Sequence, residues 1–412
     1  MNLLSKRKHH FQGYPQTAVL RATTIILIVF CLSAMSTFAK DTVWTGSWAT
    51  AAQSVDAPNM PPAPGLSNNT FRQIIRVSLG GKTIRLRFSN HFSRSPIELK
   101  AVGIAVANEN NEADISTNKV LKFNGKDSIT LAGRTEITCD PIQFNLKPGS
   151  RLAITICYGN VAKDITGHPA SRTTSYLISG NSSTTADFSQ AVKADRYYTV
   201  SRVEVLAPKK ASAIVVLGNS IADGRGSGIN KQNRWPDVLS ARLLQNKSTK
   251  LRGMLNVSIG GSSALGGGME RLEREVFGMS NVKHLILTIG VNDIGTTRSA
   301  ERADQVADNL INFYKQVVEK CHAKGIKVYG APILPFAKSM YDADYRLVAW
   351  TKVNNWIRTS KTFDAVIDFA SVMSSPEAPN ALLPNVHDND WLHPNQLGYK
   401  LMGESVNLNL FK

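Results

Sequence analysis

The sequence predicts an all-β region followed by an α/β domain whose sheet is parallel. From Val43 to about Leu206, hydrophobic residues recur with a period of two and turn signals separate the runs, which is typical of a sandwich or jelly roll. From Ala211 onward, short apolar runs alternate with stretches of helical period, which is typical of a parallel sheet covered by helices on both faces. We therefore expect a β-sandwich domain over 40–207 and an α/β domain over 208–412.

Strands of the first region are expected wherever a short run alternates hydrophobic and polar residues. The runs 71–79 and 83–88 are separated by Gly80 and Gly81, and this spacing predicts a short β-hairpin. His168 lies in a polar loop, where we expect a surface histidine rather than a catalytic one; the alternative is that this loop leans over the site of the other domain. Further strands are expected at 101–107, 128–131, 142–146, 152–157 and 175–178.

The second half reads as five strands alternating with helices. We expect strands at 214–217, 251–259, 284–289, 326–329 and 365–369, and helices at 235–245, 269–277, 300–324, 345–359 and 395–408. Because the carboxyl ends of parallel strands share one edge of the sheet, residues that follow these strands should meet there.

The first 39 residues carry the pattern of an export signal. A basic start precedes the apolar run 25–32, and the small-residue ending indicates cleavage after Ala39. We therefore expect an exported protein, periplasmic or extracellular, with no stable membrane span after the signal is removed. An uncleaved membrane anchor over 22–39 is the alternative, which the Thr and Ser content weakens.

Charge argues against a nucleic-acid partner. The formal net charge of +17 falls to +13 without the four basic residues of the export segment. The remaining basic residues are spread out, as where Arg85 and Arg87 alternate along a strand, and they form no cluster with stacking aromatics. A cationic, solvated surface is expected, with attraction to acidic polysaccharide or anionic lipid as the alternative.

Three cysteines follow the export segment, in a compartment that permits disulfides. Cys139 and Cys157 lie almost symmetrically about 147–150, so a hairpin there would place them opposite each other on neighbouring strands. Because Cys157 is out of phase with the apolar alternation of 152–156, a disulfide and two buried free thiols are equal alternatives. Cys321, near the end of a predicted helix, is expected to be inert core.

The turns after the strands hold residue types that suit acyl transfer. Ser220 follows a buried strand, and a serine hydroxyl needs a base to become a nucleophile. We expect Asp390 and His393, three residues apart, to share one helical turn, where the carboxylate accepts from Nδ1 and leaves Nε2 free to take the serine proton. The N–H groups of Ser220 and Gly261 and the amide of Asn292 are the natural donors to the oxyanion.

These residues carry a resemblance. The chain has Gly-Asn-Ser at 218–220, Gly-Gly at 260–261, Gly-Val-Asn-Asp at 290–293 and Asp-Trp-Leu-His-Pro at 390–394. This order resembles the four sequence blocks of the SGNH hydrolases, also called the GDSL esterase/lipase family. The region ahead of them, with Gly-Ser-Trp-Ala at 46–49 and Phe-Arg-Gln at 71–73, is similar to a secreted branch of arylesterases or acyl hydrolases, some of them associated with xylan breakdown.

The resemblance implies a flavodoxin-like, three-layer α/β/α catalytic domain over 208–412. It implies Ser220 as nucleophile, His393 as base and Asp390 as its orienting carboxylate, with Ser220, Gly261 and Asn292 as oxyanion donors. It also implies that no metal or organic cofactor takes part, and the sequence shows no zinc motif.

One residue departs from the family pattern, which has Asp where this chain has Asn219. Asn is nearly isosteric, so the turn should survive, but the charge is lost and an amide donor is introduced. Asp388 is a competing orienting carboxylate, and the spacing and the family pattern both favour Asp390.

The function expected from these features is that of an exported carboxylic ester hydrolase that forms an acyl-enzyme. Its expected substrate is a short-chain acyl ester, O-acetyl above all, small or on polysaccharide. One alternative is a lipolytic or thioester acyl hydrolase of the same family. The other is a glycan-binding protein with an inactive esterase domain, which Asn219 favours.

Overall fold

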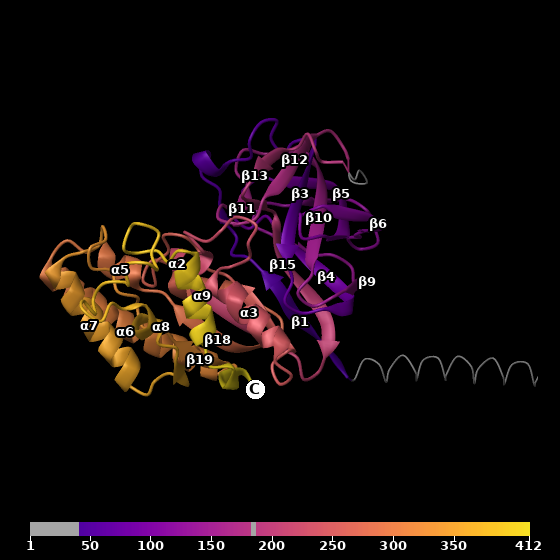
Figure 1. Ribbon diagram of the computed structural model, residues 1–412. Coiled ribbons are helices and arrows are strands. Elements are labelled where there is room, and N and C mark those ends of the chain that lie inside the picture. Colours follow the sequence, from indigo (N-terminus) through magenta and orange to yellow (C-terminus); the bar gives the residue numbers. More distant parts are fainter. Residues whose placement is uncertain (1–40, 183–186) are drawn as a thin grey trace, which may run out of the picture. The chain divides into compact units, whose positions relative to one another are not determined.

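A computed structural model describes residues 41–182 and 187–412, of which Val43–Lys412 form one compact unit (Figure 1). The export signal predicted for 1–39 and the alternative anchor over 22–39 lie outside the described residues. Among the helices of the described ranges, none has both the length and the apolar character needed to cross a membrane.

The first part of the compact unit is built from strands in three sheets. One sheet has the order β1-β15-β4-β8, with β9 also paired to β4; the second has the order β13-β12-β3-β10-β5-β6, with β7 paired to β5; the third is β14-β11-β2. The strands are β1 (Thr42–Ala49), β2 (Gln53–Ser54), β3 (Asn69–Arg76), β4 (Gly81–Ser89), β5 (Ile97–Ala107), β6 (Ala113–Val120), β7 (Ile129–Leu131), β8 (Glu136–Thr138), β9 (Ile142–Leu146), β10 (Arg151–Val161), β11 (Thr166–His168), β12 (Ser175–Ser179), β13 (Val192–Ala194), β14 (Tyr197–Tyr198) and β15 (Val200–Pro208), with a short 3-10 helix at Ala57–Asn59.

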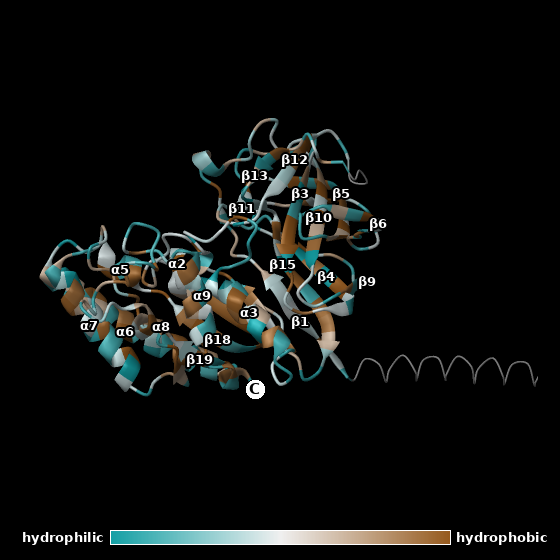
Figure 2. Ribbon diagram, in the orientation of Figure 1, coloured by the Kyte–Doolittle hydropathy of each residue, from teal (hydrophilic) through white to brown (hydrophobic). Residues whose placement is uncertain are grey.

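The two larger sheets bury a common core, as the period-two pattern predicted for a sandwich. Leu86 and Val203 of the first sheet pack in the same cluster as Phe71, Ile104 and Leu152 of the second. Figure 2 shows hydrophobic residues concentrated on strands such as β10, whose first nine residues are buried. A strand buried on both faces loses the hydrophobic-polar alternation on which strand phasing depends.

The predicted Gly80-Gly81 hairpin is wrong. β3 and β4 are consecutive in the chain but lie in different sheets, so the glycine pair forms a corner between them. Gly80 is needed there because a Cβ atom would lie 2.3 Å from the Leu146 carbonyl oxygen. Two glycines allow a corner as readily as a hairpin turn, which is why the local signal misled.

The hairpin proposed at 147–150 is wrong for the same reason. β9 pairs with β4 in the first sheet, whereas β10 pairs with β3 and β5 in the second. Cys139 therefore follows β8 of the first sheet, whereas Cys157 lies in β10 of the second, and each is a buried free thiol. Cys321 is also free and buried, as expected.

The second part is a parallel sheet with the strand order β17-β16-β18-β19-β20. Numbered from β16, this is the order 2-1-3-4-5 of flavodoxin-like folds, which confirms the predicted fold class. The strands are β16 (Ser212–Gly218), β17 (Arg252–Asn256), β18 (Val282–Thr288), β19 (Lys327–Gly330) and β20 (Ala365–Val366).

Two groups of helices pack within this part, with α3 against α9 and α6 against α7 (Figure 1). Right-handed crossovers between parallel strands put the two groups on opposite faces of the sheet. The helices are α2 (Ser220–Asp223), α3 (Trp235–Gln245), α4 (Gly268–Arg271), which continues as a π-helix at Leu272–Phe277, α5 (Val291–Gly295), α6 (Ala300–His322), α7 (Asp344–Thr359), α8 (Phe369–Met373), α9 (Gln396–Ser405) and a 3-10 helix at Leu408–Phe411.

The last strand is shorter than predicted. β20 ends at Val366, and Asp368 begins α8 by accepting a hydrogen bond from the Ser371 N–H at 3.0 Å. The apolar run 365–369 fitted a buried strand and the start of a buried helix equally well, and the Asp cap decided between them.

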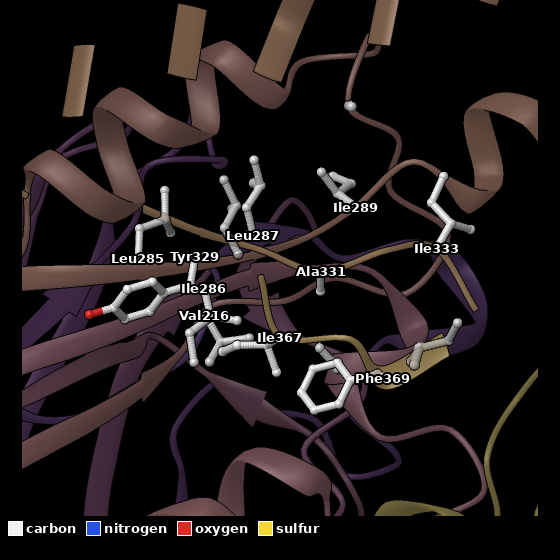
Figure 3. Close-up of a cluster of buried hydrophobic side chains, with 14 of the residues drawn as sticks. Val216, Leu285, Ile286, Leu287, Ile289, Tyr329, Ala331, Ile333, Ile367 and Phe369 are labelled. Carbon is white, nitrogen blue, oxygen red and sulfur yellow. The ribbon is translucent and has the colours of Figure 1, made fainter. Parts of the chain in front are cut away.

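The sheet core explains why the strand ends are held rigidly. β16 is buried along its whole length. Figure 3 shows Leu285 and Leu287 on one side of β18 and Ile286 with Val216 on the other. Side chains packed on both faces fix the strands, and with them the turns at the carboxyl edge.

Candidate active site

Ser220 lies where β16 ends and α2 begins. A Cβ atom on Gly218 would lie 2.4 Å from Thr288 Oγ1, so the strand must end in glycine for the turn to pack against β18. The side-chain oxygen of Asn219 accepts a hydrogen bond from the Ile221 N–H at 3.0 Å and caps α2. This turn leaves the Ser220 hydroxyl at the carboxyl edge of the sheet.

Asp390 and His393 lie in a loop rather than on a helical turn, so that expectation is wrong. An antiparallel bridge between His387 and Pro394 closes the loop, and Trp391 has a φ of 56°, outside the helical region. The spacing of three residues fits either geometry, because an aspartate side chain can fold back to hold the N–H groups that follow it.

The Asp390 carboxylate holds this loop together. Its Oδ1 accepts hydrogen bonds from the N–H groups of Leu392 at 3.0 Å and of His393 at 2.9 Å. Its Oδ2 lies 2.6 Å from Nδ1 of the His393 ring. The carboxylate therefore fixes both the backbone and the ring of the histidine.

The structure brings Ser220, His393 and Asp390 together in one row. Nε2 of His393 lies 2.8 Å from Oγ of Ser220. Because a carboxylate only accepts, Nδ1 carries the proton toward Asp390 and Nε2 is left to accept from the serine hydroxyl. The backbone N–H of the competing Asp388 donates to the His393 carbonyl at 2.8 Å, and its carboxylate acts on the imidazole through its charge rather than through the Nδ1 hydrogen bond, which Asp390 accepts.

Burial and hydrogen bonding set the charge of this row. Burial lowers the pKa of His393 below its ordinary value, and the hydrogen bond and charge of Asp390 oppose that shift in part. Burial by itself raises the pKa of Asp390, but the hydrogen bonds from His393 and Leu392 outweigh it and hold the pKa below its usual range. A neutral imidazole beside a charged carboxylate is the arrangement in which the ring accepts a proton.

Gly261 lies in the turn that follows β17. The Ser262 N–H donates to the Ile259 carbonyl at 3.2 Å, and Gly261 at the third position of this turn has a φ of 75°, which favours glycine. Within the described ranges, neither the Gly261 N–H nor the Ser220 N–H donates to another residue. Both donors are therefore available to an incoming group.

Asn292 lies at the start of α5, after β18. Its amide nitrogen donates to the Ser262 carbonyl at 2.8 Å, and its amide oxygen accepts from the Tyr341 hydroxyl at 3.0 Å. These two contacts fix the orientation of the amide, since a carbonyl only accepts. One N–H of the amide is left over for a ligand.

Ser262 and Arg271 connect the three turns, and sequence reasoning missed both. The Ser262 hydroxyl lies between two carbonyl acceptors, Ile259 at 2.9 Å and Gly218 at 3.1 Å. The buried Arg271 guanidinium donates to Ser262 Oγ at 2.9 Å and to the carbonyls of Gly218 and Val257, while Glu275 balances its charge at 3.0 Å. The predicted Gly-Gly block pointed to this turn, but not to the residues that hold it.

Asp293, next to Asn292 in the predicted block, also has a structural contact of its own. Its carboxylate accepts from the N–H groups of Ala264 at 2.8 Å and Leu265 at 2.9 Å. Burial raises the pKa of Asp293, and these two hydrogen bonds oppose the shift. These hydrogen bonds connect the turn after β18, which holds Asp293, to the segment that follows the Gly261 turn.

His168 is buried, so the predicted surface position is wrong. Nε2 of His168 lies 2.9 Å from Oδ1 of Asp223, three residues after Ser220. The segment reaches the α/β part of the chain, as the alternative expected, but His168 is the last residue of strand β11 and not part of a loop. No local pattern pointed to the pair, because the two residues are 55 positions apart.

A groove of about 550 Å³ is lined by Asp293, which follows Asn292, and by Ser263, which follows the turn that holds Gly261. Six of its nine lining residues carry a hydroxyl or guanidinium group; the nine are Ser263, Leu265, Asp293, Thr296, Thr297, Arg298, Ser299, Arg302 and Val306. Among the described residues, no group of three or more His, Cys, Asp and Glu side chains is placed to hold a metal ion.

This fold and this row of side chains define an α/β enzyme of the hydrolase class. Residues 216–401 match the model of the GDSL-like Lipase/Acylhydrolase family, and that part of the chain is a domain of this family. The protein is accordingly a carboxylic ester hydrolase. A search of curated proteins gave no match.

Several solved structures are similar to part of the chain. A member of the lipolytic protein G-D-S-L family from Veillonella parvula DSM 2008 is 22% identical, covers 47% of this chain and 96% of its own, and has a TM-score of 0.36. A GDSL-like lipase from Bacteroides thetaiotaomicron VPI-5482 is 20% identical over 48% and 86%, with a TM-score of 0.36. The psychrotrophic esterase EstA from Pseudoalteromonas sp., inhibited by monoethylphosphonate, is 19% identical over 47% and 93%, with a TM-score of 0.35.

Proposed function

We propose that this protein is an exported serine esterase that removes short acyl groups, acetyl above all, from carbohydrate or similar polar esters. The observation that carries the proposal is the row of hydrogen bonds from Ser220 Oγ to His393 Nε2 at 2.8 Å and from His393 Nδ1 to Asp390 Oδ2 at 2.6 Å. The pattern of the first 39 residues supports export to the periplasm or beyond the cell.

In the first step, Ser220 Oγ attacks the carbonyl carbon of the ester. His393 Nε2 takes the hydroxyl proton as the C–O bond forms, and Asp390 stabilises the imidazolium that results. The carbonyl π electrons move to the oxygen, which becomes an oxyanion. Each preorganised donor to such an oxyanion contributes roughly 3 kcal/mol to lowering the barrier.

The donors proposed for this oxyanion come from three turns at one edge of the sheet. They are the N–H groups of Ser220 and Gly261 and the remaining amide N–H of Asn292. Ser262 connects all three turns, since its hydroxyl lies 3.1 Å from the Gly218 carbonyl oxygen and its own backbone carbonyl accepts from the Asn292 amide. Donors fixed in this way need no reorganisation when the charge develops.

The tetrahedral intermediate then collapses to an acyl-enzyme. The bond to the leaving alkoxide breaks, and His393 returns its proton to that oxygen. A water molecule next gives a proton to His393 and attacks the acyl carbon, and the collapse of the second intermediate releases the carboxylic acid and restores the Ser220 hydroxyl.

The polar groove beside Asn292 supports a polar ester as substrate. Its threonine, serine and arginine side chains can hydrogen-bond to the hydroxyl groups of such a substrate. A chain-length series of p-nitrophenyl esters tests this part, with the highest kcat/KM expected for acetate. A preference for long chains, or for thioesters, would favour a lipolytic or thioester hydrolase instead.

Replacing Ser220 tests the mechanism. Ser220→Ala should abolish release of p-nitrophenol from the acetate ester and labelling by a fluorophosphonate. Ser227→Ala is the matched control, because Ser227 Oγ has no hydrogen-bond partner among the described residues. Wild-type protein that is not labelled would favour the inactive glycan-binding alternative. Acetate release from a panel of acetylated polysaccharides then identifies the natural ester.

A further inference from the structure

His168 and Asp223 form a buried pair that the proposed reaction does not use. His168 ends β11 and Asp223 ends α2, and their exposed fractions are 3% and 2%. Nε2 of the imidazole lies 2.9 Å from Oδ1 of the carboxylate. The pair thus connects the antiparallel part of the chain to the short helix that begins with Ser220.

The hydrogen-bond partners place two protons on this pair. Nδ1 of His168 lies 2.9 Å from the Ala51 carbonyl oxygen, which only accepts, so Nδ1 is protonated and donates. Nε2 faces a carboxylate oxygen, which is also an acceptor, so a second proton lies in that bond. The pair is neutral as a whole, and this explains how an imidazole and a carboxylate are buried together.

The second oxygen of the carboxylate reaches the turn that holds Gly261. Oδ2 of Asp223 accepts a hydrogen bond from the Gly260 N–H at 2.9 Å. Gly260 and Gly261 are the two central residues of the turn from Ile259 to Ser262. Glycine has more backbone freedom than any other residue. The position of this turn therefore depends on hydrogen bonds from residues outside it.

We propose that His168 and Asp223 are positioning residues for the proposed esterase reaction. The antiparallel strands hold His168, His168 holds Asp223, and Asp223 holds the Gly260 N–H, so that the Gly261 N–H stays aimed at the oxyanion. The inference rests on the function proposed above, because only attack by Ser220 creates an oxyanion at this place.

Three variants of the pair test the inference. Asp223→Ala and His168→Ala should each lower kcat by about 10- to 100-fold and change KM by less than about threefold, since a donor displaced by a fraction of an ångström weakens the transition state more than the substrate complex. The double variant should lose no more than either single variant, because both break one chain of contacts.

Asp223→Asn is the rescuing variant. Its amide oxygen accepts from the Gly260 N–H, and its amide nitrogen donates to Nε2 of a neutral His168, so every hydrogen bond is kept. It should restore most of the kcat that the alanine variant loses. If the pair merely stabilised the fold, the alanine variants would not lower kcat while leaving KM nearly unchanged.

Ser280→Ala is the matched control. Ser280 Oγ donates to Glu204 Oε1 at 2.6 Å and so also joins the antiparallel part to the α/β part, just before β18 begins. It should lower the midpoint of thermal unfolding without changing kcat. If His168→Ala does not fold, His168→Gln replaces it, because the glutamine amide can donate to the Asp223 carboxylate. The kcat of His168→Gln should then stay within about tenfold of wild type.

The inference is overturned if folded Asp223→Ala and His168→Ala keep the wild-type kcat. It is equally overturned if Asp223→Asn is as impaired as Asp223→Ala, or if folded His168→Gln loses more than about tenfold. Full activity of Ser220→Ala, in contrast, would remove the proposed function itself, so the two failures are distinguishable.

Discussion

The Asp390 carboxylate contacts His393 twice, through Oδ1 to the backbone N–H at 2.9 Å and through Oδ2 to ring Nδ1 at 2.6 Å. One side chain therefore sets both the path of the loop and the tautomer of the ring. Because the two residues are three positions apart, local contacts within the loop form this pair. Only Ser220 comes from a distant part of the chain.

Asp390→Asn should lower kcat for p-nitrophenyl acetate by on the order of 10³-fold or more. The amide oxygen can still accept from the backbone, but the amide nitrogen facing Nδ1 forces the proton onto Nε2, which then cannot accept from Ser220. Asp388→Asn is the matched control and should stay within about threefold of wild type, since Asp390 and not Asp388 accepts the hydrogen bond from ring Nδ1. An equal loss in both variants would contradict the assignment of Asp390.

The pH dependence of kcat/KM should report the His393 imidazole. The ring must be neutral to accept the serine proton, so activity is lost as the pH falls through its pKa. Because burial lowers that pKa, the midpoint of the acid limb should lie below 6.5, the ordinary value for histidine. A midpoint above 6.5, measured with the acetate ester, would show that the pKa of His393 is raised and not lowered.

Arg225 offers a way to move that midpoint. Its positive charge lowers the pKa of His393, and its guanidinium, more than half exposed, lies 4.0 Å from Asp390. Arg225→Gln should therefore raise the midpoint of the acid limb, while Arg225→Lys should leave it near the wild-type value. A shift of the Gln variant toward lower pH would contradict the prediction.

Asn219 should tolerate replacement by the aspartate usual in the family. Asp keeps the oxygen that accepts from the Ile221 N–H, so Asn219→Asp should retain kcat within about threefold. Asn219→Ala removes the cap and should cost about 1 kcal/mol in the free energy of unfolding, measured with urea. A large gain in kcat for Asn219→Asp would show instead that the Asn restrains this enzyme.

Tyr341→Phe should affect kcat more than KM. Without the hydroxyl, the Asn292 amide keeps only its contact with Ser262 and is free to rotate, which should lower kcat by about tenfold. Tyr345→Phe is the matched control, because that hydroxyl donates to the Thr297 carbonyl at 3.2 Å and not to Asn292. Equal kinetics of the two variants would remove Tyr341 from the site.

His284 should make the fold sensitive to acid. Burial, with the charges of Arg252 and Lys327, lowers its pKa to about 4. The folded pKa lies below the unfolded value near 6.5, so stability is lost as the pH falls, by about 3 kcal/mol at pH 4.

Urea unfolding at pH 7 and pH 4 measures this loss. His284→Phe, which can keep the ring contacts with Tyr329 and Phe411, should lose less stability between the two pH values than wild type does. His91→Phe controls for the removal of an imidazole elsewhere. An unchanged pH dependence in His284→Phe would exclude this residue as the cause.

The local sequence predicted the α/β part well. Apolar runs and helical periods gave its five strands and most of its helices, and their parallel order followed from the alternation alone. Ser220, Gly261 and Asn292 each follow a different strand, so the rule that carboxyl ends meet at one edge was enough to group them. Their spacing in the sequence predicted that Asp390 and His393 form a pair, although the two residues lie in a loop and not on a helical turn.

The same local signals failed in the antiparallel part. Gly80-Gly81 and 147–150 have good turn chemistry, but each connects two sheets and not two paired strands. Strand pairing in a sandwich is decided by partners distant in sequence, and a turn sequence carries no information about them.

The sequence by itself determined which groups stand at the carboxyl edge of the sheet, because a strand, its end and the turn after it are local. Only the tertiary structure decided that His168 meets Asp223 and that Asp223 meets Gly260. The first contact joins two different sheets, and the second joins the segments that follow two neighbouring strands of one sheet. In neither pair are the two residues close to each other in the chain. Burial of the two side chains against each other follows from packing alone.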